Sequence, residues 1–291
     1  MRVGIRKRAA AAVTVMSAVT ALLVSAPGVS SAAPDAVPSL RAYGITGDGS
    51  LMVTFTTDRP QRLDWVQQIM GLSGDTKLVA VDHRPRNGLL YGLGDKGGIY
   101  TIKTPPAVDN VLITKVSQLQ VALYGTTFDM DFNPAADRLR VISDRGQNLR
   151  HDVDGHTTAT DGALNLPPAT TNALGVTAAG YTNNDLVGST GTTLIDIDTY
   201  NDQVVIQSPP NAGNLVATGL LGFDAGLDAG LDIFSTVVGG KTVANDAFAT
   251  LTPYGSTLPS LYSLNILTGE PTPIGQFPLN VTDLAITLSG S

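Results

Sequence analysis

The sequence contains no cysteine in 291 residues. A thiol nucleophile, a thiolate zinc site and disulfide exchange are therefore excluded. Histidine is also scarce, because the chain has only His83, His151 and His156. Their spacing does not match the HExxH pattern of zinc proteases. A chain of this length can bury enough apolar surface to fold without disulfides.

Three further shortages narrow the class of partner. Aromatic residues make up only 5% of the chain, which is low for a dedicated lectin. The 18 Lys and Arg residues are outnumbered by 25 Asp and Glu residues, so we expect neither nucleic acid nor an anionic membrane as a partner. Beyond residue 32 no apolar run is long enough to span a membrane. We expect a monomer that binds a small molecule, a glycan or a protein.

The first 32 residues have the pattern of a secretory signal peptide. The basic residues at the start are Arg2, Arg6, Lys7 and Arg8. An apolar stretch, 9–24, follows, and small residues end the segment, so we expect cleavage after Ala32 and a secreted protein. An uncleaved membrane anchor is the alternative, which the short, Ala-rich stretch disfavours. Residues 33–38 are predicted to be a flexible lead-in and residues 39–291 to be one domain.

The stretch from Phe128 to Asp154 indicates the architecture most clearly. Apolar and polar residues alternate in its first five positions, and Asn133-Pro134 marks a turn. A second predicted strand, 139–142, is followed by an Asp/Gly turn and by a third strand, 149–153. The chain contains 31 Gly and 17 Pro residues, which is typical of strands joined by turns. No segment of ten or more residues after the signal peptide shows a convincing helical period.

Residues 78–103 repeat this stretch at an offset of 49 residues. Asp82 falls on Asp131, and Pro85 falls on Pro134. An internal repeat of about 50 residues is typical of a propeller. The third copy is predicted to have strands at 175–181, 185–189, 193–198 and 203–207, and the fourth at 228–234, 244–251, 261–266 and 271–277.

The opening strands of the repeats begin near residues 79, 128, 176, 228 and 281. The first unit, from Leu40, lacks an opening strand, whereas residues 281–288 form a lone strand at the end. Because a lone strand would leave its edges exposed, we predict that it completes the N-terminal blade. The predicted fold class is therefore all-β, a β-propeller of five four-stranded blades.

The segment GTTFDMDFNPAADRLRVISDRGQNLRHDVDG, residues 125–155, resembles the DUF4394 family of secreted bacterial proteins. The stretches VTAAGYTNND, TLIDIDT, QSPPNAG and LYSLNILTG extend the resemblance over nearly all of the chain after the signal peptide. The resemblance implies a propeller-like fold. It implies no catalytic residues, because the family has no assigned function.

Carboxylates gather on the predicted opening strands, which line the channel of a propeller. Asp129 and Asp131 are two residues apart and therefore face the same side. Asp82, Asp131 and Asp283 form a candidate site for a hard cation such as Ca²⁺. The same carboxylates are candidates for the acid and base of a glycosidase. The structural alternative is that they only begin the turns that the following prolines complete.

The densest polar cluster predicts a binding site for a carboxylate, a phosphate or a sugar hydroxyl. The candidate ligand-binding residues are Asp129, Asp131, Arg140, Asp144, Asn148 and Arg150. The structural alternative is a hairpin with a charged solvent face and a buried Arg–Asp pair between blades. Residues 152–155, Asp-Val-Asp-Gly, match part of a calcium loop but lack the later Glu of an EF-hand.

Two functions follow from these patterns. The first is a secreted, non-catalytic binding or scaffolding protein of unknown ligand, with recognition at the mouth of the channel. The alternative is an extracellular hydrolase of glycans or lactones that uses the channel carboxylates and a bound cation. Carboxylates more than about 10 Å apart would remove the basis for the hydrolase. The sequence alone leaves open whether the protein is an enzyme.

Overall fold

The computed structural model describes residues 36–291, which consist of strands, turns and loops. The predicted signal peptide and its cleavage after Ala32 lie outside the described residues. Residues 37–291 form one unit. Among the described residues the only helix is the three-residue 3₁₀ helix η1 (Pro210–Ala212). No helix in this part of the chain has the length and apolar character that a membrane span requires.

Twenty strands form four hydrogen-bonded sheets. The largest sheet has the order β20 (Val281–Ile286), β1 (Arg41–Thr46), β2 (Leu51–Thr56), β3 (Trp65–Met70), β7 (Val111–Gln118), β6 (Gly98–Lys103), β5 (Leu90–Gly94) and β4 (Leu78–His83). The second has the order β11 (Thr157–Thr160), β10 (Asn148–Asp152), β9 (Arg138–Ser143) and β8 (Phe128–Asn133). The third has the order β12 (Val176–Tyr181), β13 (Leu194–Asp198), β14 (Gln203–Gln207) and β15 (Leu215–Leu220). The fourth has the order β16 (Ala225–Val238), β17 (Lys241–Pro253), β18 (Ser260–Leu264) and β19 (Pro271–Gln276).

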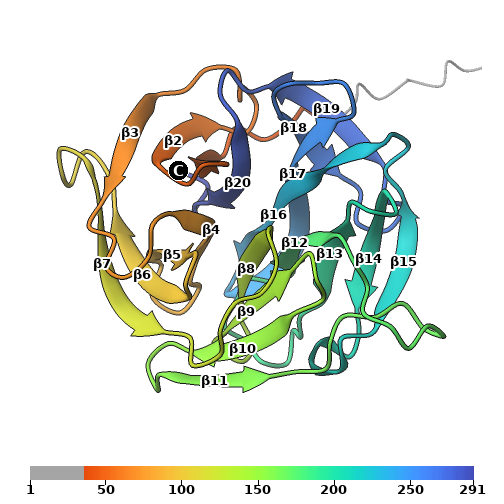
Figure 1. Ribbon diagram of the computed structural model, residues 1–291. Coiled ribbons are helices and arrows are strands. Elements are labelled where there is room, and N and C mark those ends of the chain that lie inside the picture. The colour runs from red at the N-terminus through yellow and green to blue at the C-terminus, as the bar shows by residue number, and fades with distance from the viewer. Residues whose placement is uncertain (1–35) are drawn as a thin grey trace, which may run out of the picture. The chain divides into compact units, whose positions relative to one another are not determined.

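Five inner strands, β4, β8, β12, β16 and β20, surround the centre of this unit (Figure 1). Each contacts the next in this order, and β20 contacts β4, so the contacts close a ring. The arrangement confirms an all-β, propeller-like fold. The centre of the ring is the channel to which the acidic residues were assigned.

The C-terminal strand closes the ring as the sequence predicts. β20 pairs antiparallel with β1, with Gly44 opposite Leu284. The predicted positions of the opening strands are also confirmed, because the inner strands begin at residues 78, 128, 176, 225 and 281. The segment 62–72, which the sequence indicates to be a third strand and a connection, contains the strand β3.

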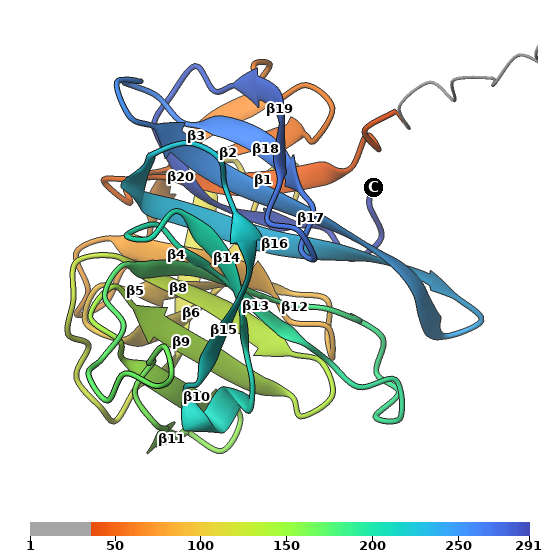
Figure 2. The ribbon, with the colours of Figure 1, turned by 90° about the vertical axis from the view of Figure 1, so that its right-hand side faces the viewer.

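Three details differ from the prediction. The outer strands β3 and β7 pair in parallel at Ile69–Val111 and Met70–Leu112, which joins eight strands in one sheet. Residues 185–189 form no strand, because this polar segment belongs to the loop between β12 and β13. The β16–β17 hairpin is longer than predicted and projects from the sheets (Figure 2).

The apolar core lies between neighbouring sheets. One cluster combines Leu93 of β5 with Phe132 of β8 and Leu139 of β9, all at most 1% exposed. Alternating strand residues point to opposite faces, so each sheet contributes one apolar face to each neighbour. The inner strands are therefore held at a fixed separation, which determines how close the channel side chains lie.

We expect Gly230→Ala to lower the free energy of unfolding by about 1–3 kcal/mol, the usual effect of overpacking. A Cβ atom at Gly230 would lie 2.5 Å from Oδ1 of Asp283 and 2.8 Å from the carbonyl oxygen of Thr282. Urea unfolding measures the change. The matched control is Gly188→Ala, because a Cβ at Gly188 meets nothing within 4 Å. Equal stabilities for the two variants would contradict this account of the β16–β20 contact.

Candidate functional site

The channel contains five buried aspartates, which we call the inner carboxylates. They are Asp82 on β4, Asp129 and Asp131 on β8, Asp232 on β16 and Asp283 on β20. None is more than 6% exposed. The repeat places them there because the inner strand of each copy presents alternate residues to the same side.

Four of the inner carboxylates each accept two backbone N–H groups. The carboxylate of Asp82 accepts the N–H of His83 at 2.6 Å and that of Phe132, on the neighbouring inner strand, at 2.8 Å. The carboxylates of Asp129, Asp232 and Asp283 accept in the same way, and their cross-strand donors are Ala179, Ile286 and Val81. Buried N–H groups need an acceptor. These side chains therefore fasten β4 to β8, β8 to β12, β16 to β20 and β20 to β4.

The remaining contact between inner strands, β12–β16, is apolar. A side chain at Gly180 would meet Leu231 and Ile233 at 3.2 Å, so the two strands approach closely without a carboxylate between them. The ring is thus closed by four polar contacts and one apolar contact.

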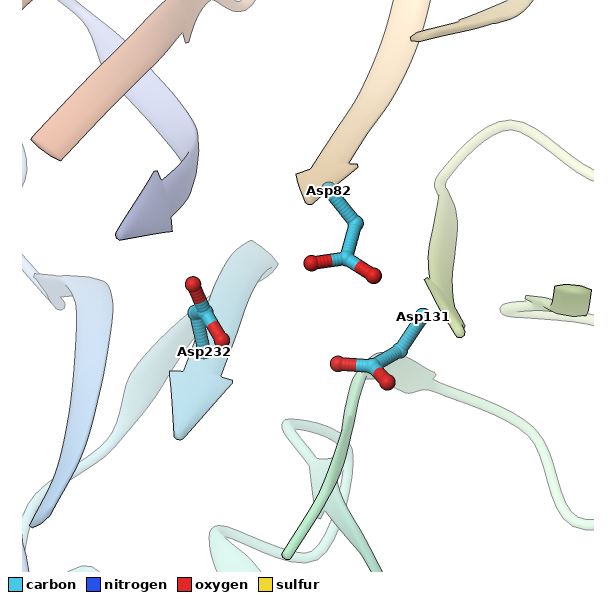
Figure 3. A group of neighbouring side chains, drawn as sticks. All are labelled: Asp82, Asp131 and Asp232. Carbon is cyan, nitrogen blue, oxygen red and sulfur yellow. The ribbon is translucent and has the colours of Figure 1, made fainter. Parts of the chain in front are cut away.

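The inner carboxylates occupy two levels. The carboxylate of Asp82 accepts the N–H of Phe132, the residue that follows Asp131, so Asp82 and Asp131 lie at the same level. The carboxylate of Asp283 accepts the N–H of Val81, the residue that follows Ala80. Ala80 lies two residues before Asp82 on the same face of β4, so Asp283 lies one level away from Asp82. We call the level of Asp82 and Asp131 the upper level. Asp232 lies at this level too, and oxygens of Asp82, Asp131 and Asp232 lie within 4.8 Å of one another (Figure 3).

The structure brings together two residues of the predicted metal triad. The structure brings Asp82 and Asp131 together, but with Asp232 in place of Asp283. The physical reason is the register of β20, whose upper-level residue is Ala285, two residues beyond Asp283 on the same face. The sequence analysis predicts a strand at 228–234 but does not select its Asp232 as a metal ligand.

Burial is the main influence on these acids. It raises the pKa of Asp82, Asp129, Asp131 and Asp283 well above the usual value, and it raises the pKa of Asp232 to about 6. Repulsion adds to burial, because Asp232 raises the pKa of Asp82 and Asp82 raises that of Asp131. Carboxylates this close cannot all ionise easily in a low-dielectric site, so we infer that the upper level shares protons near neutral pH.

Three predicted ligand-binding residues, the buried Arg140 and Asn148 and the partly exposed Arg150, lie in one group. Nη1 of Arg140 donates to Asp161 at 2.6 Å and to Asn148 at 2.7 Å, and Nε of Arg150 donates to Asp161 at 2.7 Å. Arg140 is 1% exposed and also donates to Asn211, across the boundary between two sheets. The group therefore joins the β8–β11 sheet to the β12–β15 region, as the structural alternative predicted.

The other predicted residues lie apart from this group. Asp144 accepts the N–H and the hydroxyl of Thr126 at 2.8 and 2.9 Å, and so holds the segment that leads into β8. The partial calcium loop is also occupied by protein contacts. Asp152 pairs with Arg138 at 3.0 Å, and Asp154 pairs with Arg84 at 2.7 Å. The polar cluster of the sequence is thus divided among several structural contacts.

A hollow of about 40 Å³ lies where the inner strands begin, and we call it the mouth hollow. Its polar lining includes Thr46, Lys77, Thr126, Asp228 and Thr282, and Phe128 adds an aromatic ring. Asp228 is exposed to solvent at the edge of this hollow. Burial raises the pKa of Asp228 to about 6, and the charge of Lys77 acts in the opposite direction. The sequence analysis did not select Asp228 as a binding residue.

Comparison with known proteins identifies a family but no activity. The sequence profile described as "Domain of unknown function (DUF4394)" matches residues 51–285. No curated protein matches the chain.

Several solved structures are similar at low identity. The WD40 domain of coronin from Toxoplasma gondii is 12% identical, with a TM-score of 0.41 and coverage of 82% of this chain and 56% of that one. An auxiliary nutrient binding protein from Bacteroides thetaiotaomicron is 11% identical, with a TM-score of 0.42 and coverage of 79% and 57%. Glutaminyl cyclase from Myxococcus xanthus is 12% identical, with a TM-score of 0.44 and coverage of 78% and 97%. The chain spans little more than half the length of the first two, and likeness this remote indicates no function.

We expect the thermal midpoint to be higher at pH 5 than at pH 7.5. A raised folded-state pKa gives stability that is full below the unfolded pKa and is lost as pH rises through the folded pKa. For Asp232 that loss falls between pH 3.8 and about 6. The pKa of each other inner carboxylate is also raised well above the usual value, so its contribution is likewise lost as pH rises. His83 and His151 oppose the trend, since burial lowers the pKa of His83 to about 4 and also lowers that of His151, but five carboxylates outweigh two imidazoles. Melts across this pH range measure the change.

Asp232→Asn is the matched variant, because it removes one titrating group and should flatten the rise. A midpoint that falls steadily from pH 7.5 to pH 5 would contradict proton sharing in the channel. Millimolar calcium serves as the control at pH 7.5. A cation among the upper carboxylates would ionise them, raise the midpoint and remove the pH dependence.

We expect Asp161→Asn to lower the free energy of unfolding by about 3–5 kcal/mol, because it leaves the buried Arg140 without its carboxylate. Asp64→Asn is the control. It removes an exposed pair with Arg41 at 3.6 Å, which should change stability by about 1 kcal/mol or less. Urea unfolding of both variants gives the comparison, and similar small losses would show that Arg140 is not a buried clamp.

Proposed function

The chain belongs to the DUF4394 family, and we propose that it is a secreted binding or scaffolding protein whose channel is not catalytic. Secretion rests on the signal-peptide pattern of residues 1–32, and the domain would comprise residues 39–291. The observation that carries the proposal is the double N–H contact of the inner carboxylates. Side chains that accept two backbone donors each, and that are at most 6% exposed, are suited to holding strands rather than turning over substrate.

We infer that the ring has five blades. The eight-stranded sheet divides naturally into β20-β1-β2-β3 and β4-β5-β6-β7, because only two residue pairs join β3 to β7. Each half then has four antiparallel strands that run from an inner strand to an outer strand, like the other three sheets. The repeat of about 50 residues in the sequence supports the same count.

The hydrolase alternative has the right distances but lacks access. Oxygens of Asp82, Asp131 and Asp232 lie within 4.8 Å of one another, which fulfils the condition that the carboxylates be close. A glycosidase must, however, place its sugar between the two carboxyl groups. Here these groups are 5–6% exposed, and two of them accept two N–H donors each. Burial therefore disfavours the hydrolase.

The mouth hollow supports recognition of a hydroxyl-bearing ligand. It combines the carboxylate of Asp228, the ammonium group of Lys77 and several threonine hydroxyls. Opposite charges side by side favour a neutral ligand that both donates and accepts hydrogen bonds, as a sugar does. Phe128 adds an apolar ring to the lining. A volume of about 40 Å³ admits one edge of such a ligand and leaves the rest outside. We therefore assign the terminal sugar of a glycan as the ligand class.

Asp228→Asn should weaken monosaccharide binding by about tenfold or more, since one charge-assisted hydrogen bond contributes roughly 1.5–3 kcal/mol. Titrations with glucose, galactose and N-acetylglucosamine, followed by NMR shifts of the hollow residues, measure the effect. Asp224→Asn is the control, because Asp224 lies four residues upstream and outside the mouth hollow. The absence of binding for all three sugars, or equal losses in both variants, would refute this assignment.

A further inference from the structure

A serine and two histidines meet at the boundary between two sheets, away from the channel. Oγ of Ser117, on β7, lies 2.8 Å from Nε2 of His151, on β10, and 2.9 Å from Nδ1 of His156. His156 lies in the turn between β10 and β11 with a positive φ of 52°. Neither the inner carboxylates nor the mouth hollow involves these residues.

The hydrogen bonds permit an arrangement of protons in which His151 is the base. A hydroxyl has one proton, so Ser117 can donate to only one of the two rings. Nδ1 of His151 lies 3.0 Å from Oγ1 of Thr158, which already accepts the N–H of Gln120 at 2.9 Å. If Nδ1 of His151 donates to this oxygen, Nε2 is left as the acceptor for Ser117, and His156 donates to Ser117. This is the relation between a nucleophile, its base and an orienting group.

The site combines a fully buried base with a nucleophile at the edge of a surface hollow. His151 is completely buried, and Ser117, itself only 7% exposed, lines with His156 an open hollow of about 600 Å³ on the surface. Gln118 and Gln120 also line this hollow and supply polar groups beside the serine. A small molecule can therefore approach Ser117 from the solvent side while the imidazole behind it remains shielded.

We propose that Ser117 is a base-activated nucleophile that takes an acyl group from small esters. In the first step Oγ forms a bond to the carbonyl carbon, and the Oγ proton moves to Nε2 of His151. The bond between the carbonyl carbon and the alcohol oxygen then breaks, and the alcohol leaves with that proton. Water cleaves the acyl-serine by the reverse proton route and restores the hydroxyl. This role goes beyond the proposed binding function, because the site lies outside the channel.

The surroundings of His151 keep it in the form that a base needs. Burial lowers the pKa of His151, His156 acts in the same direction, and Asp152 acts in the opposite direction. The neutral form of the ring, which can accept a proton, is therefore favoured. Thr158 is a positioning residue here, because it contacts only the far nitrogen of the imidazole.

A fluorophosphonate probe tests the proposal directly on the folded protein. Attack by Oγ forms an O–P bond, expels fluoride and passes the serine proton to His151. We expect the label on Ser117, mapped by peptide mass spectrometry, and complete loss of that label in Ser117→Ala. Ser50→Ala is the control and should label like the wild type, because the hydroxyl of Ser50 donates to the carboxylate of Asp48 and faces no histidine base.

The rate of labelling distinguishes an activated serine from one that is only exposed. His151→Gln should slow labelling by about 100-fold or more, the usual contribution of a general base. Because His151 is completely buried and its replacement can disturb folding, Thr158→Val provides a second variant that keeps the imidazole and should slow labelling while circular dichroism remains native. The wild-type rate should change little between pH 7.5 and 6.5. The absence of labelling, labelling at another serine, or a Thr158→Val rate equal to that of the wild type would overturn the proposal.

Discussion

The structure depends on a hydrogen bond from the backbone N–H of one inner strand to the carboxylate of the next. Each inner strand is the first strand of its sheet, so one of its edges has no strand partner. Unpaired N–H groups on a buried edge cost free energy unless an acceptor is provided. The carboxylate of a neighbouring strand provides that acceptor across the channel, as Asp82 does for Phe132. The same hydrogen bonds therefore close the ring and provide acceptors for N–H groups on the strand edges.

This arrangement accounts for an acidic channel without invoking chemistry. Carboxylates from several strands must converge when strands that carry them meet around a common centre. The resulting burial and repulsion raise their pKa values. The stability of the fold is thus coupled to proton uptake at its centre, and the coupling follows from geometry. Reachable polar groups remain at the ends and at the rim, where Asp228 and Ser117 lie.

The sequence predicted features that depend on local pattern. The offset of 49 residues placed Asp82 and Asp131 at equivalent positions, and the structure brings them together at one level. The lone final strand predicted ring closure, which the β20–β1 pairing confirms. The period-2 pattern and the turn residues were sufficient for these conclusions because they act within one repeat.

Features that depend on contacts between repeats were not predictable. Asp232, and not Asp283, lies with Asp82 and Asp131 at the upper level. The reason is the register of β20 relative to β4, which is set by packing across the ring. Asp161 and Asn211 bind Arg140 from 21 and 71 residues away, and no local pattern marks them. A single sequence also gave no sign that Ser117 would meet His151. Such pairs become visible only when the sheets are placed side by side.

The choice of aspartate at the inner positions has its own physical reason. Two N–H donors approach the two oxygens of one side chain, as His83 and Phe132 do at Asp82. Asparagine has one acceptor oxygen, so its amide group would direct a donor at a donor. Glutamate has the two oxygens, but its longer chain would have to be accommodated between strands that packing holds at a fixed distance. Aspartate alone satisfies both donors at this spacing, and a proton shared between neighbouring carboxylates relieves their repulsion while the N–H contacts remain. The acidity of the channel is therefore a consequence of fastening strands through their edges.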